Sequence, residues 1–77
     1  MACIDANGKI TRSAELILLA LLKPLTIEQT AVECRMPLFR VRGSIRELGK
    51  TGLVIEVNGK FHTTAKGVSA LEGNPII

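Results

Sequence analysis

Aromatic residues are almost absent from this sequence, which has no Trp or Tyr and only two Phe, at positions 39 and 61. Yet 47% of its 77 residues are hydrophobic. The core must therefore be built from Leu, Ile, Val and Ala, which suits short, closely packed helices. A chain of this length has room for one hydrophobic core, so residues 1–77 are predicted to form a single domain.

Cysteine and histidine are also scarce. Cys3 and Cys34 make no disulfide framework, and with His62 they match none of the usual metal-binding spacings. His62 has no obvious acidic partner, and no serine or cysteine has a base at a recognisable spacing. We therefore expect no enzymatic activity, no metal and no other cofactor. Cys34 is interpreted as a small core residue and His62 as a surface residue.

No long hydrophobic run is present. The longest, Leu16–Leu22, is far shorter than the ~20 residues of a membrane-spanning helix. Residues Met1–Ile10 lack the basic start and the long apolar stretch of a signal peptide. Together with a cysteine usage that fits a reducing compartment, these absences predict a soluble, cytoplasmic protein with no membrane segment.

What the sequence does have is a strongly basic segment. Residues 35–50 carry a net charge of +4, whereas the whole chain carries only +3. The basic residues of this segment are Arg35, Arg40, Arg42, Arg46 and Lys50. Because guanidinium groups can form paired hydrogen bonds with phosphates and guanine edges, this charge predicts a nucleic-acid-binding face. The alternative is an ordinary solvated helix face.

The apolar residues of the same segment recur at helical spacing. They lie at i, i+3, i+7 and i+10, and are Leu38, Val41, Ile45 and Leu48. This pattern predicts an amphipathic helix over about residues 37–50, with Pro37 at its first position and Gly52 as its C-terminal cap. Gly43 lies on the face away from the apolar residues, where it allows another surface to approach the backbone closely.

Two further helices are predicted before this one. The first, about Ser13–Leu22, follows a cap at Thr11 or Ser13 and is apolar around nearly its whole circumference. Such a helix is either buried on all sides or shared with a partner, so a homodimer through Ser13–Leu22 is predicted. The second begins at Thr26, which with Gln29 fits the capping-box pattern. It ends about three residues before the basic helix, an arrangement typical of a helix-turn-helix.

Residues 53–64, LVIEVNGKFHTT, follow the predicted cap at Gly52 and predict a β-hairpin that turns at Asn58-Gly59. Of two possible loops, we favour three residues, 57–59, because this register pairs Ile55 with Phe61 and sets Glu56 opposite Lys60. It turns Leu53, Ile55, Phe61 and Thr63 toward the helices, and turns Val54 and His62 outward. Thr64 is expected to cap a last helix, about Ala65–Leu71. The predicted class is mainly α with a small antiparallel hairpin, with an N-terminal arm or small hairpin at 1–12 and a frayed tail at 73–77.

The segment LTIEQTAVECRMPLFRVRGSIRELGKTGLV, with the hairpin and TTAKG after it, resembles the winged helix-turn-helix domain of small prokaryotic regulators of the MarR-like and ArsR-like type. The resemblance implies a three-helix core with a short wing. It implies that Val41, Ile45, Leu48, Leu53 and Val54 pack the recognition helix and wing. It also implies a DNA-facing surface formed by Leu38, Phe39, Arg40, Arg42, Gly43 and Arg46.

The leading functional hypothesis is a dimeric transcriptional regulator that binds double-stranded DNA. In it Arg40, Arg42 and Arg46 enter the major groove and Thr26, Arg35 and Lys50 meet the DNA backbone. Lys60 contributes positive charge from the wing. The alternative is a protein-interaction module, in which the apolar first helix and Phe39 dock onto a protein partner.

Overall fold

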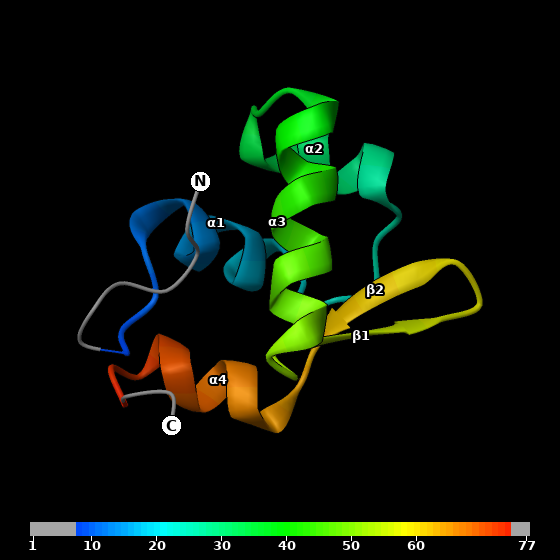
Figure 1. Cartoon of the computed structure of the whole chain (residues 1–77). Coiled ribbons are helices and arrows are strands. Elements are labelled where there is room, and N and C mark those ends of the chain that lie inside the picture. The colour runs from blue at the N-terminus through cyan, green and yellow to red at the C-terminus, as the bar shows by residue number, and fades with distance from the viewer. Residues whose placement is uncertain (1–7, 75–77) are drawn as a thin grey trace.

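The computed structural model describes residues 8–74, arranged as Figure 1 shows. The chain forms the helices α1 (Arg12–Ala20), α2 (Ile27–Cys34) and α3 (Leu38–Lys50), the strands β1 (Val54–Val57) and β2 (Lys60–Thr63), and the helix α4 (Ala65–Leu71). The predicted class, mainly helical with a small antiparallel sheet, is confirmed. The predictions for the N-terminal arm and the tail fall mostly on residues 1–7 and 75–77, which lie outside the described residues.

Threonine side chains begin three of these helices, as their sequence positions predict. The Thr11 hydroxyl accepts a hydrogen bond from the Ala14 amide at the start of α1. At α2 the capping box is complete: the Thr26 hydroxyl accepts from the Gln29 amide at 3.1 Å, and the Gln29 side chain accepts from the Thr26 amide at 3.0 Å. Thr64 caps α4. Each cap satisfies amide groups that the helix itself leaves unpaired.

The core lies where α1, α3 and the hairpin meet. Its buried apolar residues are Ala14, Ile17, Leu18, Leu21, Val41, Ile45, Leu48, Leu53, Val54 and Ala70. α1 ends at Ala20, two residues before the predicted end, and it is not buried on all sides, because Leu19 is 48% exposed. Leu22, just after the helix, is 52% exposed.

Residues 35–37 join α2 to α3. Arg35 has a φ of 55°, in the left-handed region, and the Met36 amide donates to the Ala31 carbonyl at 3.0 Å to close α2. Pro37 precedes α3 rather than occupying its first position, and its carbonyl accepts from the Val41 amide at 3.2 Å. α2 has eight residues, and α3 has thirteen, one fewer than the predicted range 37–50.

α3 buries the predicted apolar residues Val41, Ile45 and Leu48, whereas Leu38 in its first turn stays 38% exposed. At its C-terminal end Gly52 has a φ of 80°, and the Leu53 amide donates to the Leu48 carbonyl at 2.9 Å. This hydrogen bond is typical of a glycine-terminated helix, so the predicted cap at Gly52 is confirmed.

The predicted hairpin register is wrong. The loop has two residues, Asn58 and Gly59, with φ of 54° and 81°, and the strands pair Val54 with Thr63, Ile55 with His62 and Glu56 with Phe61. Positive φ at both loop residues is the geometry that an Asn-Gly dipeptide adopts in a tight hairpin. This turn chemistry outweighs the Glu56–Lys60 charge pair that favoured the longer loop.

The correction reverses the two faces of β1. Val54 is buried and Ile55 is half exposed, the opposite of the orientation argued from the register. The burial of Val54 agrees instead with the packing that the family resemblance implied. His62 is exposed, as predicted.

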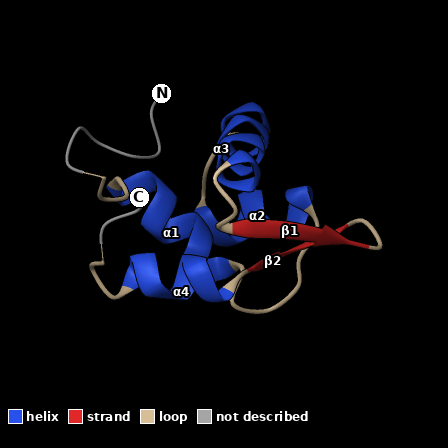
Figure 2. Cartoon of the chain, turned by 60° about the horizontal axis from the view of Figure 1, so that its bottom comes forward, coloured by secondary structure: helices blue, strands red, loops and turns tan. Residues whose placement is uncertain are grey.

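β2 connects the hairpin to the helical core. Phe61 and Leu25 exchange backbone hydrogen bonds of 2.7 and 3.1 Å, and the Thr63 hydroxyl donates to the Leu18 carbonyl at 2.8 Å. Figure 2 shows the hairpin extending from the helices, with its loop at the far end. None of the helices in the described part of the chain combines the length and apolar composition that crossing a bilayer requires.

Candidate nucleic-acid interface

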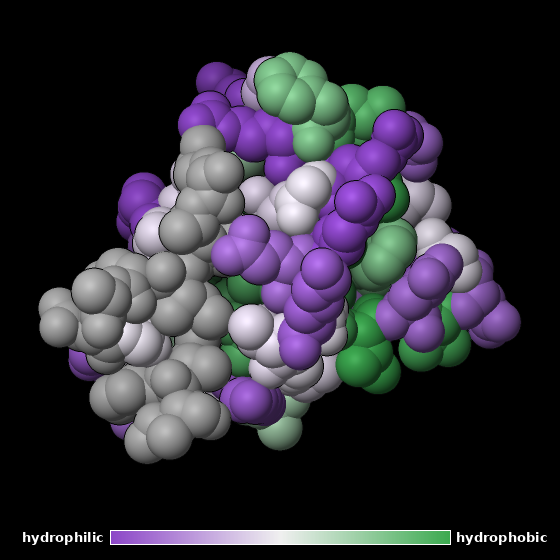
Figure 3. Space-filling view, viewed as in Figure 1, coloured by the Kyte–Doolittle hydropathy of each residue, from purple (hydrophilic) through white to green (hydrophobic). Residues whose placement is uncertain are grey.

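The exposed side of α3 carries four basic residues, Arg40, Arg42, Arg46 and Lys50. Because Val41, Ser44, Ile45 and Leu48 are buried, the helical repeat places the opposite side along a line of residues at i, i+4, i+7 and i+11. These residues are Phe39, Gly43, Arg46 and Lys50, all exposed. In Figure 3 hydrophilic residues gather over α3, and apolar residues lie beside them toward the hairpin.

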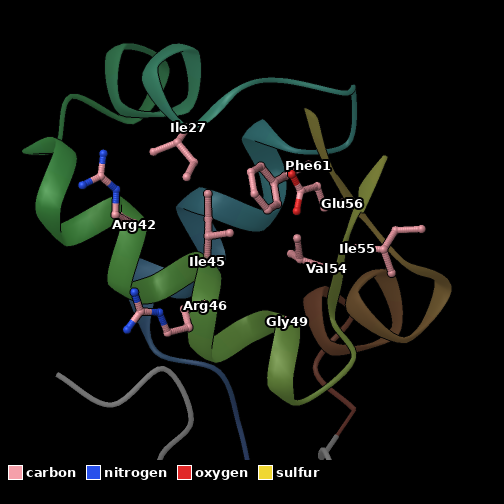
Figure 4. Close-up of a pocket in the computed structure, with 9 residues that line it drawn as sticks. All are labelled: Ile27, Arg42, Ile45, Arg46, Gly49, Val54, Ile55, Glu56 and Phe61. Carbon is pink, nitrogen blue, oxygen red and sulfur yellow. The ribbon is translucent and has the colours of Figure 1, made fainter. Parts of the chain in front are cut away.

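A groove of about 560 Å³ separates α3 from the hairpin. Figure 4 shows Arg42 and Arg46 on the α3 side, Phe61 and Glu56 on the hairpin side, and Ile45 between them. The remaining lining residues are Ile27, Gly49, Val54 and Ile55. The groove therefore has an apolar floor, with Arg42 and Arg46 at its α3 edge and Glu56 on the hairpin side, and Figure 4 shows both guanidinium groups turned away from Phe61.

Arg42 and Arg46 differ in their ion pairing from Arg12, the arginine at the start of α1. Arg12 forms an ion pair with Glu15 at 2.6 Å, and Lys23 similarly faces Glu33 at 3.6 Å. No ion pair or hydrogen bond within residues 8–74 engages the guanidinium of Arg42 or Arg46. Since the two residues are four apart on one helix, they present neighbouring cationic groups to any molecule that approaches the groove.

The other predicted DNA-binding residues are distributed around this pair. Arg40 lies on the side of α3 away from the hairpin, where it lines a separate hollow with Phe39 and Gly43. Lys50 is the last residue of α3 and Lys60 the first of β2, and both are exposed.

Two of the residues predicted to contact the DNA backbone lie outside this groove. Arg35 borders a hollow between α1 and α2 with Leu19 and Cys34, so it does not share the groove with Arg42 and Arg46. The Thr26 hydroxyl already accepts the hydrogen bond that caps α2, although the next residue, Ile27, lines the groove.

Sequence reasoning missed the hairpin side of the groove. In the correct register Glu56 pairs with Phe61, on the same face as the buried pair Val54 and Thr63, so it lies toward α3. The predicted register places Glu56 opposite Lys60 instead. The signal that would have located Glu56 was the Asn58-Gly59 dipeptide, which favours a two-residue loop.

Cys34 is half buried beside the core, and its thiol donates a hydrogen bond to the Leu16 carbonyl at 3.5 Å. Burial, and to a smaller degree the negative charge of Glu33, raises the pKa of this thiol. The interpretation of Cys34 as a small core residue agrees with this position. Among residues 8–74, no group of three His, Cys, Asp or Glu side chains is placed to hold a metal ion.

The described residues form a small helical unit whose basic helix stands beside a short hairpin. Comparisons of the chain with protein-family models, with curated proteins and with solved structures gave no match.

Proposed function

We propose that this chain is a winged helix-turn-helix protein that binds double-stranded DNA sequence-specifically as a transcriptional regulator. In this proposal α2 and α3 are the helix-turn-helix, α3 is the recognition helix, and the β1–β2 hairpin is a short wing. The observation that supports it best is the pair Arg42 and Arg46, exposed on α3 without an ion-pair partner among the described residues. Such guanidiniums suit phosphate oxygens and the O6 and N7 atoms of guanine.

The surroundings of Phe39 also favour DNA over a protein partner. Phe39 is 77% exposed, and the hollow beside it is lined by Arg40, Ser44 and Glu47 as well as Pro37 and Gly43. A protein-docking face would continue as apolar surface around the ring. Here Arg40, Ser44 and Glu47 border the hollow beside the ring, and the arginine-bearing side of α3 lies next to it.

The first test is fluorescence anisotropy with random duplex DNA at several salt concentrations. We expect the logarithm of the association constant to fall linearly with the logarithm of salt concentration, by about 0.9 per phosphate contact. A slope equivalent to several contacts would support the proposal. Absence of binding at low salt would contradict it.

Arginine variants locate the interface. On a selected preferred duplex, Arg42→Ala and Arg46→Ala should each weaken binding by about 1–3 kcal/mol where a base contact is lost. Lys23→Ala is a matched control, because Lys23 also carries one positive charge but faces Glu33 away from the groove. If all three variants bind like the wild type, α3 is not the recognition helix.

The second candidate function is a protein-interaction module. It is favoured by the apolar side chains exposed on α2 and near the end of α1, namely Leu19, Leu22 and Val32, of which Val32 is 79% exposed. This candidate predicts no association with DNA at any salt concentration, and the same titration therefore separates the two functions.

A further inference from the structure

Phe39 occupies the outermost line of α3, which also contains Gly43, Arg46 and Lys50. It lies in the first turn of the helix and is 77% exposed, more than any other exposed large apolar residue of the described chain except Val32. The N-terminal residues of a recognition helix are the ones that contact base edges in the major groove. The position of Phe39 is therefore the one at which an aromatic ring would reach the bases rather than the DNA backbone.

Gly43 keeps the space beside this ring open. A Cβ atom built at Gly43 meets no other atom within 4 Å, and the hollow between Phe39 and Glu47 runs past this point. An apolar group entering beside the ring would therefore not collide with a side chain at position 43. Because Arg40, Ser44 and Glu47 also line this hollow, the apolar contact that the ring offers is bordered by polar side chains.

We infer that Phe39 is a specificity-determining residue that contacts the 5-methyl group of a thymine in the DNA site. This inference rests on the proposed function. The thymine methyl is the distinct apolar group that a base pair displays in the major groove, and apolar side chains read it by contact.

Arg46 lies seven residues farther along the same line, about 10 Å away along the helix axis. Arg46 is therefore too far along the helix to contact the same base pair as Phe39.

The test uses the whole chain and the DNA duplex that it prefers. In this duplex each thymine is replaced by uracil, one position at a time. Uracil keeps every hydrogen-bonding group of thymine and removes only the methyl. We expect the dissociation constant to rise roughly three- to fivefold at one or two positions, the loss expected for one buried methyl group. Phe39→Ala should weaken binding to the thymine duplex by a similar factor and should no longer distinguish thymine from uracil.

Two variants provide the controls. Arg46→Ala should bind more weakly but keep the preference for thymine over uracil, because the ring of Phe39 is intact. Val32→Ala removes another strongly exposed apolar side chain, on α2, and should leave the preference unchanged. Since the Phe39 side chain is 77% exposed, Phe39→Ala should stay folded, which circular dichroism checks directly.

The outcomes separate this inference from the proposed function. If the wild type binds duplex DNA but tolerates uracil at every position, the assignment of Phe39 is wrong and the proposed function stands. A thymine preference that persists in Phe39→Ala also overturns the assignment. If the wild type binds no duplex at all, both the assignment and the proposed function fail.

Discussion

Gly67 and Gly43 both lie inside helices, but their surroundings are opposite. A Cβ atom at Gly67 would lie 2.5 Å from the Leu53 carbonyl oxygen and 2.5 Å from Thr63 Cγ2, whereas at Gly43 it would meet nothing within 4 Å. We expect Gly67→Ala to lower the free energy of unfolding by about 1–3 kcal/mol, because α4 must move away from the hairpin. Gly43→Ala should raise it by roughly 0.5–1 kcal/mol, since alanine is the better helix former.

Chemical denaturation followed by circular dichroism measures both changes. Each glycine variant is the control for the other, because the same methyl group is added to a helix in both cases. Equal shifts of the two midpoints would contradict the packing of α4 against the Leu53 carbonyl.

Cys34 provides a second prediction for a single residue. Because burial and then the Glu33 charge raise the thiol pKa, less thiolate is present at neutral pH than in an ordinary cysteine. Since the thiolate is the reactive form, alkylation should be slow at neutral pH and should accelerate only as the pH rises above the ordinary cysteine pKa. The rate is measured against pH in a Cys3→Ser background, with free cysteine as reference. An apparent pKa at or below that of the reference would contradict this environment.

Helix caps were the features most accurately predicted at the level of elements, because they depend on residues three or four positions apart. Thr26 with Gln29, Thr64 before α4 and Gly52 after α3 each act as expected. The hairpin was predicted correctly as an element, but its register was not. The cross-strand charge pair Glu56–Lys60 favours a three-residue loop, but the turn geometry of Asn58-Gly59 determines the register. One shifted residue then reversed the sides of β1 and concealed Glu56 from the predicted site.

Glu56 leads to a prediction about the hairpin as part of the interface. Its carboxylate lines the groove opposite Arg42 and Arg46, where the phosphates of a bound duplex would approach. A unit charge pair at about 4 Å is worth about 1 kcal/mol in water, so Glu56→Gln should tighten binding to any duplex by roughly two- to fivefold. The anisotropy titration measures this gain for random and preferred sequences alike.

Glu72→Gln is the matched control, because Glu72 follows α4 and lies outside the groove. It removes the same single charge and should change the affinity much less. An identical gain in the two variants would show that Glu56 acts only through the net charge of the chain.

For the molecule as a whole, periodicity and local chemistry predicted the order of the elements, and the burial of Val41, Ile45 and Leu48 followed from helical spacing. How the basic residues group in space could not be predicted from spacing alone. Arg40 and Arg42 are two residues apart, so they project about 200° apart around α3 and line different hollows. The grouping of Arg42 and Arg46 with Phe61 depends on the hairpin folding beside α3, which is a long-range contact.

The predicted homodimer concerns the surface left exposed near the end of α1. Leu19 and Leu22, three residues apart, are 48% and 52% exposed, so a partner could bury them without any change in the core. We expect a dimer in sedimentation equilibrium, converted to a monomer by Leu19→Lys because the charged lysine would have to give up its hydration to be buried at this contact. The variant should remain folded, since Leu19 is outside the buried core.

A two-fold dimer would place two α3 helices on successive half-sites, so Leu19→Lys should also lose tight binding to a palindromic duplex while it retains weak binding to a single half-site. Val32→Lys adds the same charge at an exposed position of α2 and should stay dimeric. A monomeric mass for the wild type at high micromolar concentration would remove the dimer, and the preferred DNA site would then be a single half-site.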